Sequence, residues 1–165
     1  MPQDALQQQL VKYLTDVHST EQNALSTLRA GAGNVDDQQL AAAFRDHLAE
    51  TEEHERLIAE RLGAHEAGPS TLKDAAQKGV AAVTGAIANA APDTAGKMAI
   101  QAYAFEHLEI ASYRMLRQVA ERAGDHETVR VADRILKEEH VAAERLSSLL
   151  ESIADHDLHQ MGLAA

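Results

Sequence analysis

Cysteine and tryptophan are absent from the 165 residues of the chain, and aromatic residues make up only 3% of it. Without cysteine the protein has no disulfides, thiolate zinc sites, iron–sulfur clusters or cysteine nucleophiles. Because large aromatic side chains are so few, the core must be built mostly from Leu, Ala, Ile and Val. These absences exclude several classes of enzyme before any motif is considered.

Long hydrophobic runs are also missing. No stretch approaches the ~20 apolar residues that a membrane span requires. The first residues contain no basic patch followed by an apolar run, which is the pattern of a signal peptide. We therefore expect a cytoplasmic protein with no membrane partner.

Positive charge is scarce, with 15 Lys and Arg against 26 Asp and Glu and a formal net charge of −11. Nucleic acids and anionic membranes attract clustered Lys and Arg, so we expect neither as the main partner. No segment alternates like a strand, and no glycine-rich phosphate loop is present. The length suits a single domain over residues 1–165.

Glycine and proline divide the chain at a few well-separated places: Gly31 and Gly33, residues 63–69, Pro92, and Gly124. Between these breaks, apolar residues recur every three or four positions, which is the spacing of an amphipathic helix. The pattern predicts an all-α chain in which Gly31 ends the first helix. Each long helix would be ~40 Å in length. The expected helices cover residues 4–30, 36–62, 93–123 and 125–155.

The connections between these helices differ in length. The first and third are short, which favours antiparallel neighbours, whereas the second needs about 30 residues. Residues 70–90 within it are small and weakly amphipathic, and we expect one short extra helix there. A long crossover between the second and third helices is the ferritin-like arrangement of a four-helix bundle. An up-and-down bundle with an irregular insert is the alternative.

Acidic residues lie on or beside the apolar stripes of all four long helices. Glu21, for example, continues the line of Leu14 and Val17. His54 lies one turn after Glu50, and a Glu-x-x-Glu pair follows Tyr103. The candidate metal ligands are Glu21, Glu50, His54, Glu106, Glu109 and Glu139. Glutamate also favours helices in general, so each position taken alone has an ordinary explanation as a solvated residue.

Four carboxylates gathered in a bundle core would be costly, because burying each charge costs several kcal/mol and the charges repel. Either they stay protonated with raised pKa values, or cations neutralise them. Two divalent ions supply four positive charges. Mixed carboxylate and imidazole ligands favour iron or manganese, and zinc is possible.

Four segments resemble the YciF-type family of small ferritin-like bacterial stress proteins. They are residues 19–22 (STEQ), 44–51 (FRDHLAET), 106–113 (EHLEIASY) and 136–139 (LKEE), of which the third is the most specific. The resemblance implies a ferritin-like bundle that forms a homodimer and holds a dinuclear centre with two iron ions. It says little about the reaction.

One departure from that family lies in the last helix, where a second acidic side chain commonly follows the glutamate by one turn. Ala142 and Ala143 occupy those positions here. The leading hypothesis is a stress protein that binds two iron or manganese ions and performs redox chemistry with O₂ or peroxide. The alternative is a helical structural or interaction protein with a weak or vestigial metal site, and the two alanines favour it slightly.

The remaining histidines and tyrosines are expected to be less important. His18, His47 and His107 are interpreted as surface or packing residues, and His156 and His159 as part of a frayed helix end. Tyr103 and Tyr113 are interpreted as core aromatics, with a role as hydrogen-bond donors to the ligands as the alternative.

Overall fold

A computed structural model describes residues 2–65 and 94–163, and within them the chain forms four helices and no strand. The helices are α1 (Pro2–Asn34), α2 (Gln38–Ala64), α4 (Ala95–Ala123) and α5 (His126–Gln160). The all-α prediction is confirmed. The short helix expected at 70–90 lies outside the described residues.

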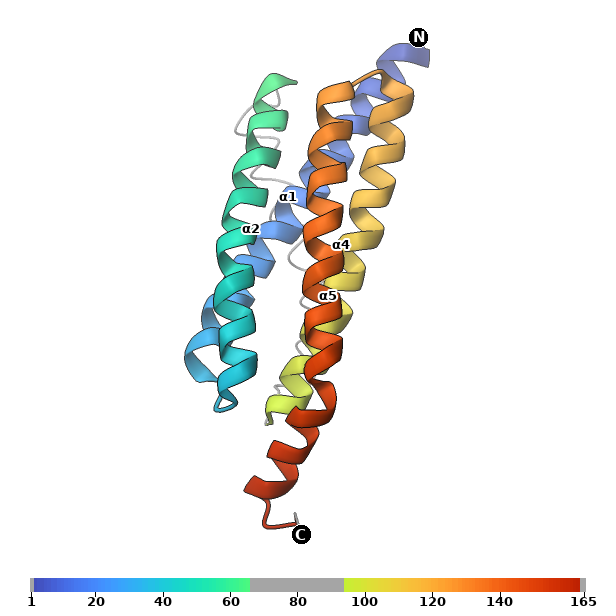
Figure 1. The fold of residues 1–165 in the computed structure, drawn as a ribbon. Helices are drawn as coiled ribbons and strands as arrows, with labels where there is room; N and C mark the ends of the chain where they lie inside the picture. Colours follow the sequence, from blue (N-terminus) through green and yellow to red (C-terminus); the bar gives the residue numbers. More distant parts are fainter. Residues whose placement is uncertain (1, 66–93, 164–165) are drawn as a thin grey trace.

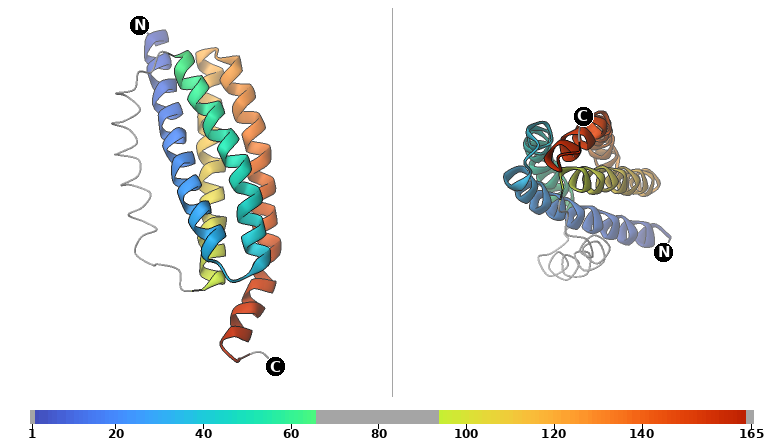
Figure 2. Two further views of the ribbon diagram at one scale, coloured as in Figure 1. Left: turned by 90° about the vertical axis from the view of Figure 1, so that its left-hand side faces the viewer. Right: turned by 90° about the horizontal axis from the view of Figure 1, so that it is seen from below.

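The four helices form one bundle (Figure 1). α1 packs on α2 and α4, and α5 packs on the same two helices. α2 and α4 run in the same direction, so α2 ends at one end of the bundle and α4 begins at the other (Figures 1 and 2). An up-and-down bundle would make them antiparallel, so the ferritin-like crossover is confirmed.

The ends of α2, α4 and α5 follow ordinary capping rules. The side chains of Asp37, Thr94 and Asp125 accept hydrogen bonds from backbone N–H groups three residues later, at 2.8, 3.2 and 3.0 Å. Gly124 ends α4 with φ of 77°, a left-handed conformation that glycine adopts without strain. The short turn between α4 and α5 is therefore fixed by local sequence.

Gly31 does not end the first helix, contrary to the expectation from sequence. α1 continues through Gly31 and Gly33 to Asn34. A Cβ atom on Gly31 would lie 2.8 Å from two ring atoms of Phe44, whereas one on Gly33 would meet nothing. Gly31 is therefore required where α1 and α2 approach closely, not as a helix stop.

The core consists of two apolar clusters at different levels of the bundle. One contains Leu10, Leu14, Ile58, Leu62, Leu116 and Ile135 among others. The second contains Leu28, Leu40, Phe44, Ala99, Leu146 and Ile153 among others. On every helix a buried polar or charged residue lies between the positions that belong to the two clusters. The bundle therefore has a polar layer enclosed between two apolar ones.

None of the helices in the described part of the chain combines the length and the apolar character that crossing a membrane requires.

Candidate metal centre

The polar layer between the two apolar clusters contains six buried ionisable side chains. α1 supplies one, α2 two, α4 two and α5 one. They are Glu21, His47, His54, Glu106, Glu109 and Glu139, and none is more than 7% exposed. Charged residues are almost never buried this deeply unless they are paired or bind metal.

These side chains converge in two groups that share one carboxylate. His47, Glu106, Glu109 and Glu139 each offer a ligand atom, and these atoms all lie within 4.8 Å of one another. Glu21, His54 and Glu139 form the second group by the same measure. Glu139 thus lies between two positions, each with histidine and carboxylate donors.

The two oxygens of Glu139 face different histidines. Oε1 lies 3.0 Å from His54 Nδ1, and Oε2 lies 3.6 Å from His47 Nε2. Nε2 of His47 is also 3.1 Å from Glu106 Oε2, and Nδ1 of His54 is 3.8 Å from Glu21 Oε2. One nitrogen of each imidazole therefore points into the carboxylate cluster.

The outer nitrogen of each imidazole is held by another glutamate. Nδ1 of His47 lies 3.0 Å from Glu50 Oε2, and Nε2 of His54 lies 2.7 Å from Glu138 Oε2. A carboxylate on the outer nitrogen fixes the orientation of a ligating imidazole and makes its inner nitrogen a better donor. The buried Tyr113 hydroxyl likewise donates a hydrogen bond to Glu21 Oε1 and leaves Oε2 facing His54.

Glu50 was expected to be a ligand, and the structure does not bring it into the cluster. Its side chain is 46% exposed and pairs with the outer nitrogen of His47. The buried line of α2 runs through His47, Thr51, His54 and Ile58. Glu50 lies roughly 70° round the helix from that line at 100° per residue. The expectation of one inward carboxylate on each helix therefore fails at α2, where two histidines take that place.

His47 was expected to be a packing residue, yet it contributes to the cluster. The signal was in the sequence, because His47 follows Leu40 and Phe44 at helical spacing. His18 agrees with expectation, since it is buried and pairs with Glu55 at 3.0 Å. His107 is exposed, and its ring makes a T-shaped contact with the ring of Tyr103.

Without metal, protons neutralise the cluster. Burial, together with the neighbouring Glu139, raises the pKa of Glu21 to about 8. Burial also raises the pKa of Glu106 to about 7 and that of Glu109 well above its usual range. For His54, burial lowers the pKa, but contacts with Glu139 and Glu21 outweigh it and raise the pKa to about 9. His47 behaves in the same way beside Glu106 and Glu50, with a pKa of about 11.

The donor atoms fit metal ions better than they fit one another. Ten buried side-chain atoms among the described residues lack a hydrogen bond of good geometry, and eight of these belong to the cluster. They include both oxygens of Glu109 and both of Glu139. A buried polar atom without a hydrogen bond destabilises the folded chain. Eight such atoms at one point therefore require a binding partner. Four carboxylates and two imidazoles match the charge and ligand preference of two divalent transition-metal ions.

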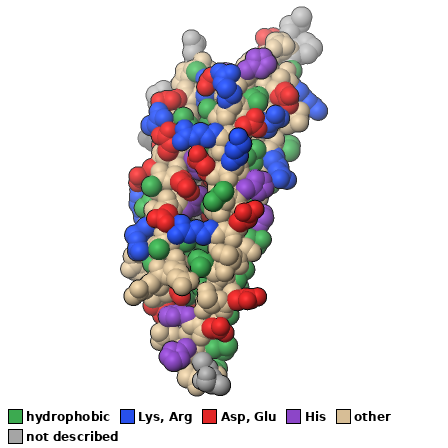
Figure 3. Space-filling model, in the orientation of Figure 1, with side chains coloured by type: hydrophobic (Ala, Val, Ile, Leu, Met, Phe, Trp, Pro, Cys, Tyr) green, Lys and Arg blue, Asp and Glu red, His purple; other side chains and the backbone are tan. Residues whose placement is uncertain are grey.

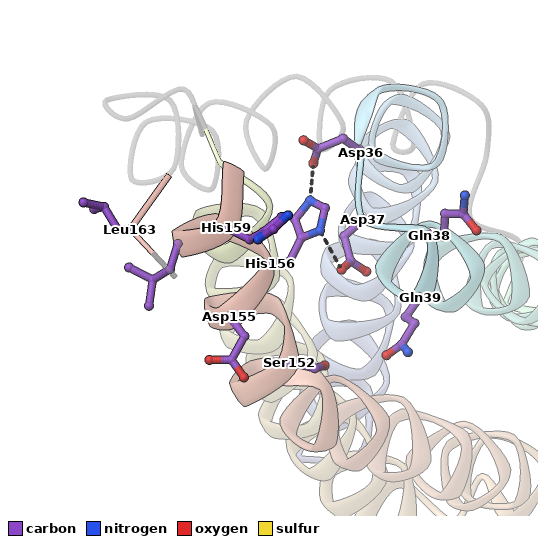
Figure 4. Close-up of a pocket in the computed structure, with 10 residues that line it drawn as sticks. Asp36, Asp37, Gln38, Gln39, Ser152, Asp155, His156, His159 and Leu163 are labelled. Carbon is purple, nitrogen blue, oxygen red and sulfur yellow. Dashed lines mark ion pairs between the residues drawn. The ribbon is translucent and has the colours of Figure 1, made fainter. Parts of the chain in front are cut away.

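A cavity of about 1030 Å³ lies at the end of the bundle, between the start of α2 and the end of α5 (Figure 4). His156 pairs there with Asp36 at 3.5 Å and Asp37 at 3.9 Å. These residues do not form a compact set of metal donors as the buried six do. His156, which lies within α5, is thus paired with the two aspartates that precede α2.

Charges of both signs mix on the face of the molecule seen in Figure 3. Arg134 of α5 lies 3.3 Å from Glu53 of α2, and Arg145 of α5 lies 2.7 Å from Asp46 of α2. These pairs connect the two helices outside the cluster.

Comparison with known proteins identifies the family and agrees with the fold. A family model described as "Domain of unknown function (DUF892)" matches residues 5–159. The chain belongs to the DUF892 family. The expected resemblance to YciF-type ferritin-like proteins is confirmed for this DUF892 chain.

Solved structures share the fold of this DUF892 chain over almost its whole length. A protein of Xanthomonas campestris pv. campestris is 27% identical, with a TM-score of 0.79 over 96% of this chain and 99% of that one. The Escherichia coli stress protein YciF is 21% identical, with a TM-score of 0.72 over 91% and 97%. A ferritin-like, diiron-carboxylate protein of Bacillus anthracis is 18% identical, with a TM-score of 0.73 over 88% and 97%. The last two comparisons support the ferritin-like fold.

Proposed function

We propose that this chain binds two divalent transition-metal ions in its polar layer, with iron as the expected metal and manganese or zinc as alternatives. The observation that carries the proposal is the set of eight buried donor atoms without good hydrogen bonds, all aimed at a common interior. Two divalent ions balance the charge of the four buried carboxylates. The diiron-carboxylate description of the Bacillus anthracis protein with this fold supports the choice of iron.

Each residue of the layer has a proposed role. His47, Glu106 and Glu109 hold one ion, Glu21 and His54 hold the other, and Glu139 lies between them. Glu50 and Glu138 orient the imidazoles, and Tyr113 orients Glu21. The apolar clusters on both sides exclude water and so strengthen the binding of cations to the carboxylates.

We further propose that the bound metal takes part in the response to oxidative stress. Iron in such a site supplies redox chemistry with O₂ or peroxide, by which oxidant is consumed or iron is oxidised. The stress role of the similar YciF supports this proposal, as does a buried site that limits access to small molecules. A cytoplasmic location is part of the same proposal.

A homodimer is proposed from an exposed face of α4. Ile100, Leu108 and Met115 are 62, 41 and 51% exposed, and the exposed Ala104 and Ala111 lie between them. This line carries no charge, whereas the chain as a whole carries −11, so two copies repel least when they meet here. In an antiparallel pair, Ile100 of one copy would face Met115 of the other, as a two-fold interface requires. Light scattering of the wild type and of Leu108→Glu tests it: a dimer that becomes a monomer supports the proposal.

Elemental analysis of the protein, purified without a histidine tag, tests the metal proposal. We expect about two iron or manganese ions per chain after aerobic addition of iron(II) and removal of loose metal. Glu109→Gln is expected to lower this content, whereas Glu144→Gln, on the exposed face of α5, leaves it unchanged. A wild-type chain that holds no metal after iron addition would contradict the proposal and favour the helical interaction protein.

A further inference from the structure

A small cavity adjoins the His47 end of the cluster. Its volume is about 40 Å³, and it lies between α2 and α5. Its rim includes the exposed Glu50, Val141 and Arg145, and its floor includes the buried His47 and Glu106. The cavity therefore leads from the surface to two of the residues that would hold the proposed metal.

Two alanines create this space. Ala43 of α2 and Ala142 of α5 both line the cavity and are both buried. Ala142 lies one helical turn after Glu139, on the same side of α5. A larger side chain at position 142 would therefore project into the opening over the cluster. At the rim, Arg145 bridges to Asp46 of α2 at 2.7 Å.

Two residues at the floor of the cavity carry unsatisfied polar atoms. His47 Nε2 and Glu106 Oε2 are fully buried atoms without a hydrogen bond of good geometry, although they lie 3.1 Å apart. A volume of this size holds at least one water molecule but no organic substrate. Its size and chemistry thus select a small polar ligand.

We propose that the cavity beside Ala142 is the position of an exchangeable, water-sized ligand of the metal held by His47 and Glu106. The ligand class is water, hydroxide or a small anion; at the rim the Arg145 guanidinium is paired with Asp46 and lies near the Glu50 carboxylate, so charge at the rim does not choose among them. This inference rests on the proposed metal site, and it adds the place of a small ligand on the α2–α5 side of that site. A second cavity, of about 500 Å³ between α1 and α4, also reaches Glu106, so within the described ranges the cavity beside Ala142 is one of two approaches to the cluster.

Azide binding to the iron-loaded protein tests the inference, because azide is small, anionic and changes the visible absorption of iron when it coordinates. Three proteins are compared: the wild type, Ala142→Leu, which fills the cavity, and Ala154→Leu, which adds the same side chain at an exposed position of α5. Iron content is measured first for each. Azide is then titrated and the absorption change gives its dissociation constant.

We expect all three proteins to hold the same amount of iron, and Ala142→Leu to bind azide at least about tenfold more weakly than the other two. The inference would be overturned if iron-loaded Ala142→Leu bound azide as tightly as the wild type, or if the iron-loaded wild type bound no azide. Neither result would contradict the proposed metal site. A wild type without iron would overturn both. If circular dichroism shows that Ala142→Leu does not fold, Ala142→Val replaces it. We then expect azide to bind more weakly than to the wild type, by a smaller factor than for leucine.

Discussion

His47 and His54 lie two turns apart on α2, with ring centroids 6.4 Å apart and one nitrogen of each ring facing Glu139. One helix therefore sets the spacing of both imidazoles, and one carboxylate from α5 reaches both. Once the packing of α5 against α2 positions Glu139, both halves of the cluster have their shared carboxylate. This makes Glu139 the residue on which the two proposed metal positions most depend.

Replacing Glu139 with Gln is expected to remove more metal than replacing any other single ligand. The amide keeps the shape of the side chain but loses the charge that both positions share. We expect elemental analysis to find less than half of the wild-type metal content. Glu144→Gln serves as control, since Glu144 is exposed on the same helix. A Glu139→Gln protein with full metal content would show that Glu139 is not a shared ligand.

Glu50→Gln is expected to weaken metal binding without changing its stoichiometry. Glu50 contacts only the outer nitrogen of His47 in the cluster, so its loss leaves every inner donor in place. Loss of such an orienting carboxylate typically costs about 10–100-fold in affinity. Competition with a chromogenic chelator measures it. Glu106→Gln is the matched comparison and is expected to lower the metal content itself, at the one position that Glu106 helps to form; identical behaviour of the two variants would place Glu50 among the ligands.

The metal-free protein is expected to be less stable at pH 9 than at pH 6. Glu21 and Glu106, with unperturbed pKa values of 4.5, have folded-state pKa values of about 8 and about 7. For His54 and His47 the value rises from 6.5 to about 9 and about 11. Between pH 6 and 9 the folded chain thus binds more protons than the unfolded chain, so stability falls as pH rises. Glu139, whose pKa is lowered, is ionised in both states throughout this window.

Thermal unfolding of the chelator-treated protein, followed by circular dichroism at both pH values, measures this dependence. The metal-loaded protein is the control, because bound cations replace the protons and flatten the dependence over this range. A metal-free chain that unfolds at a higher temperature at pH 9 than at pH 6 would refute the description of the cluster as proton-neutralised.

Gly31→Ala and Gly33→Ala are expected to change stability in opposite directions. Alanine at position 33 meets no atom and gains about 0.5–1 kcal/mol of helix propensity. At position 31 the new Cβ would press on the buried ring of Phe44, and overpacking of this kind costs about 1–3 kcal/mol, more than the propensity gain. Urea unfolding of both variants gives the two values. Stabilisation by Gly31→Ala would mean that α1 and α2 separate easily at this level.

Much of the fold could be predicted from the sequence because helix periodicity and loop length are local properties. The breaks at Gly63 and Gly124 lie at or near true helix ends. Gly31 misled the prediction because its role is a contact with Phe44, a residue on another helix. No pattern within one helix distinguishes a glycine that ends it from one that admits a neighbour.

The same limit explains the errors at the site. Glu21, Glu106, Glu109 and Glu139 lie in the middle of apolar stripes, so their burial follows from spacing alone. Glu50 and His47 are three residues apart, and a shift of the stripe by less than a quarter turn exchanges their roles. The pairing of His54 with Glu138 depends on how α2 packs against α5, which one sequence does not reveal.

The central claim is that the buried layer holds two metal ions that share Glu139. Anomalous diffraction from crystals of the iron-loaded protein, recorded on either side of the iron absorption edge, tests it most directly. We expect two strong peaks, one beside His47, Glu106 and Glu109 and one beside Glu21 and His54, with Glu139 between them. A map with no peak in this layer, from protein shown to contain iron, would contradict it.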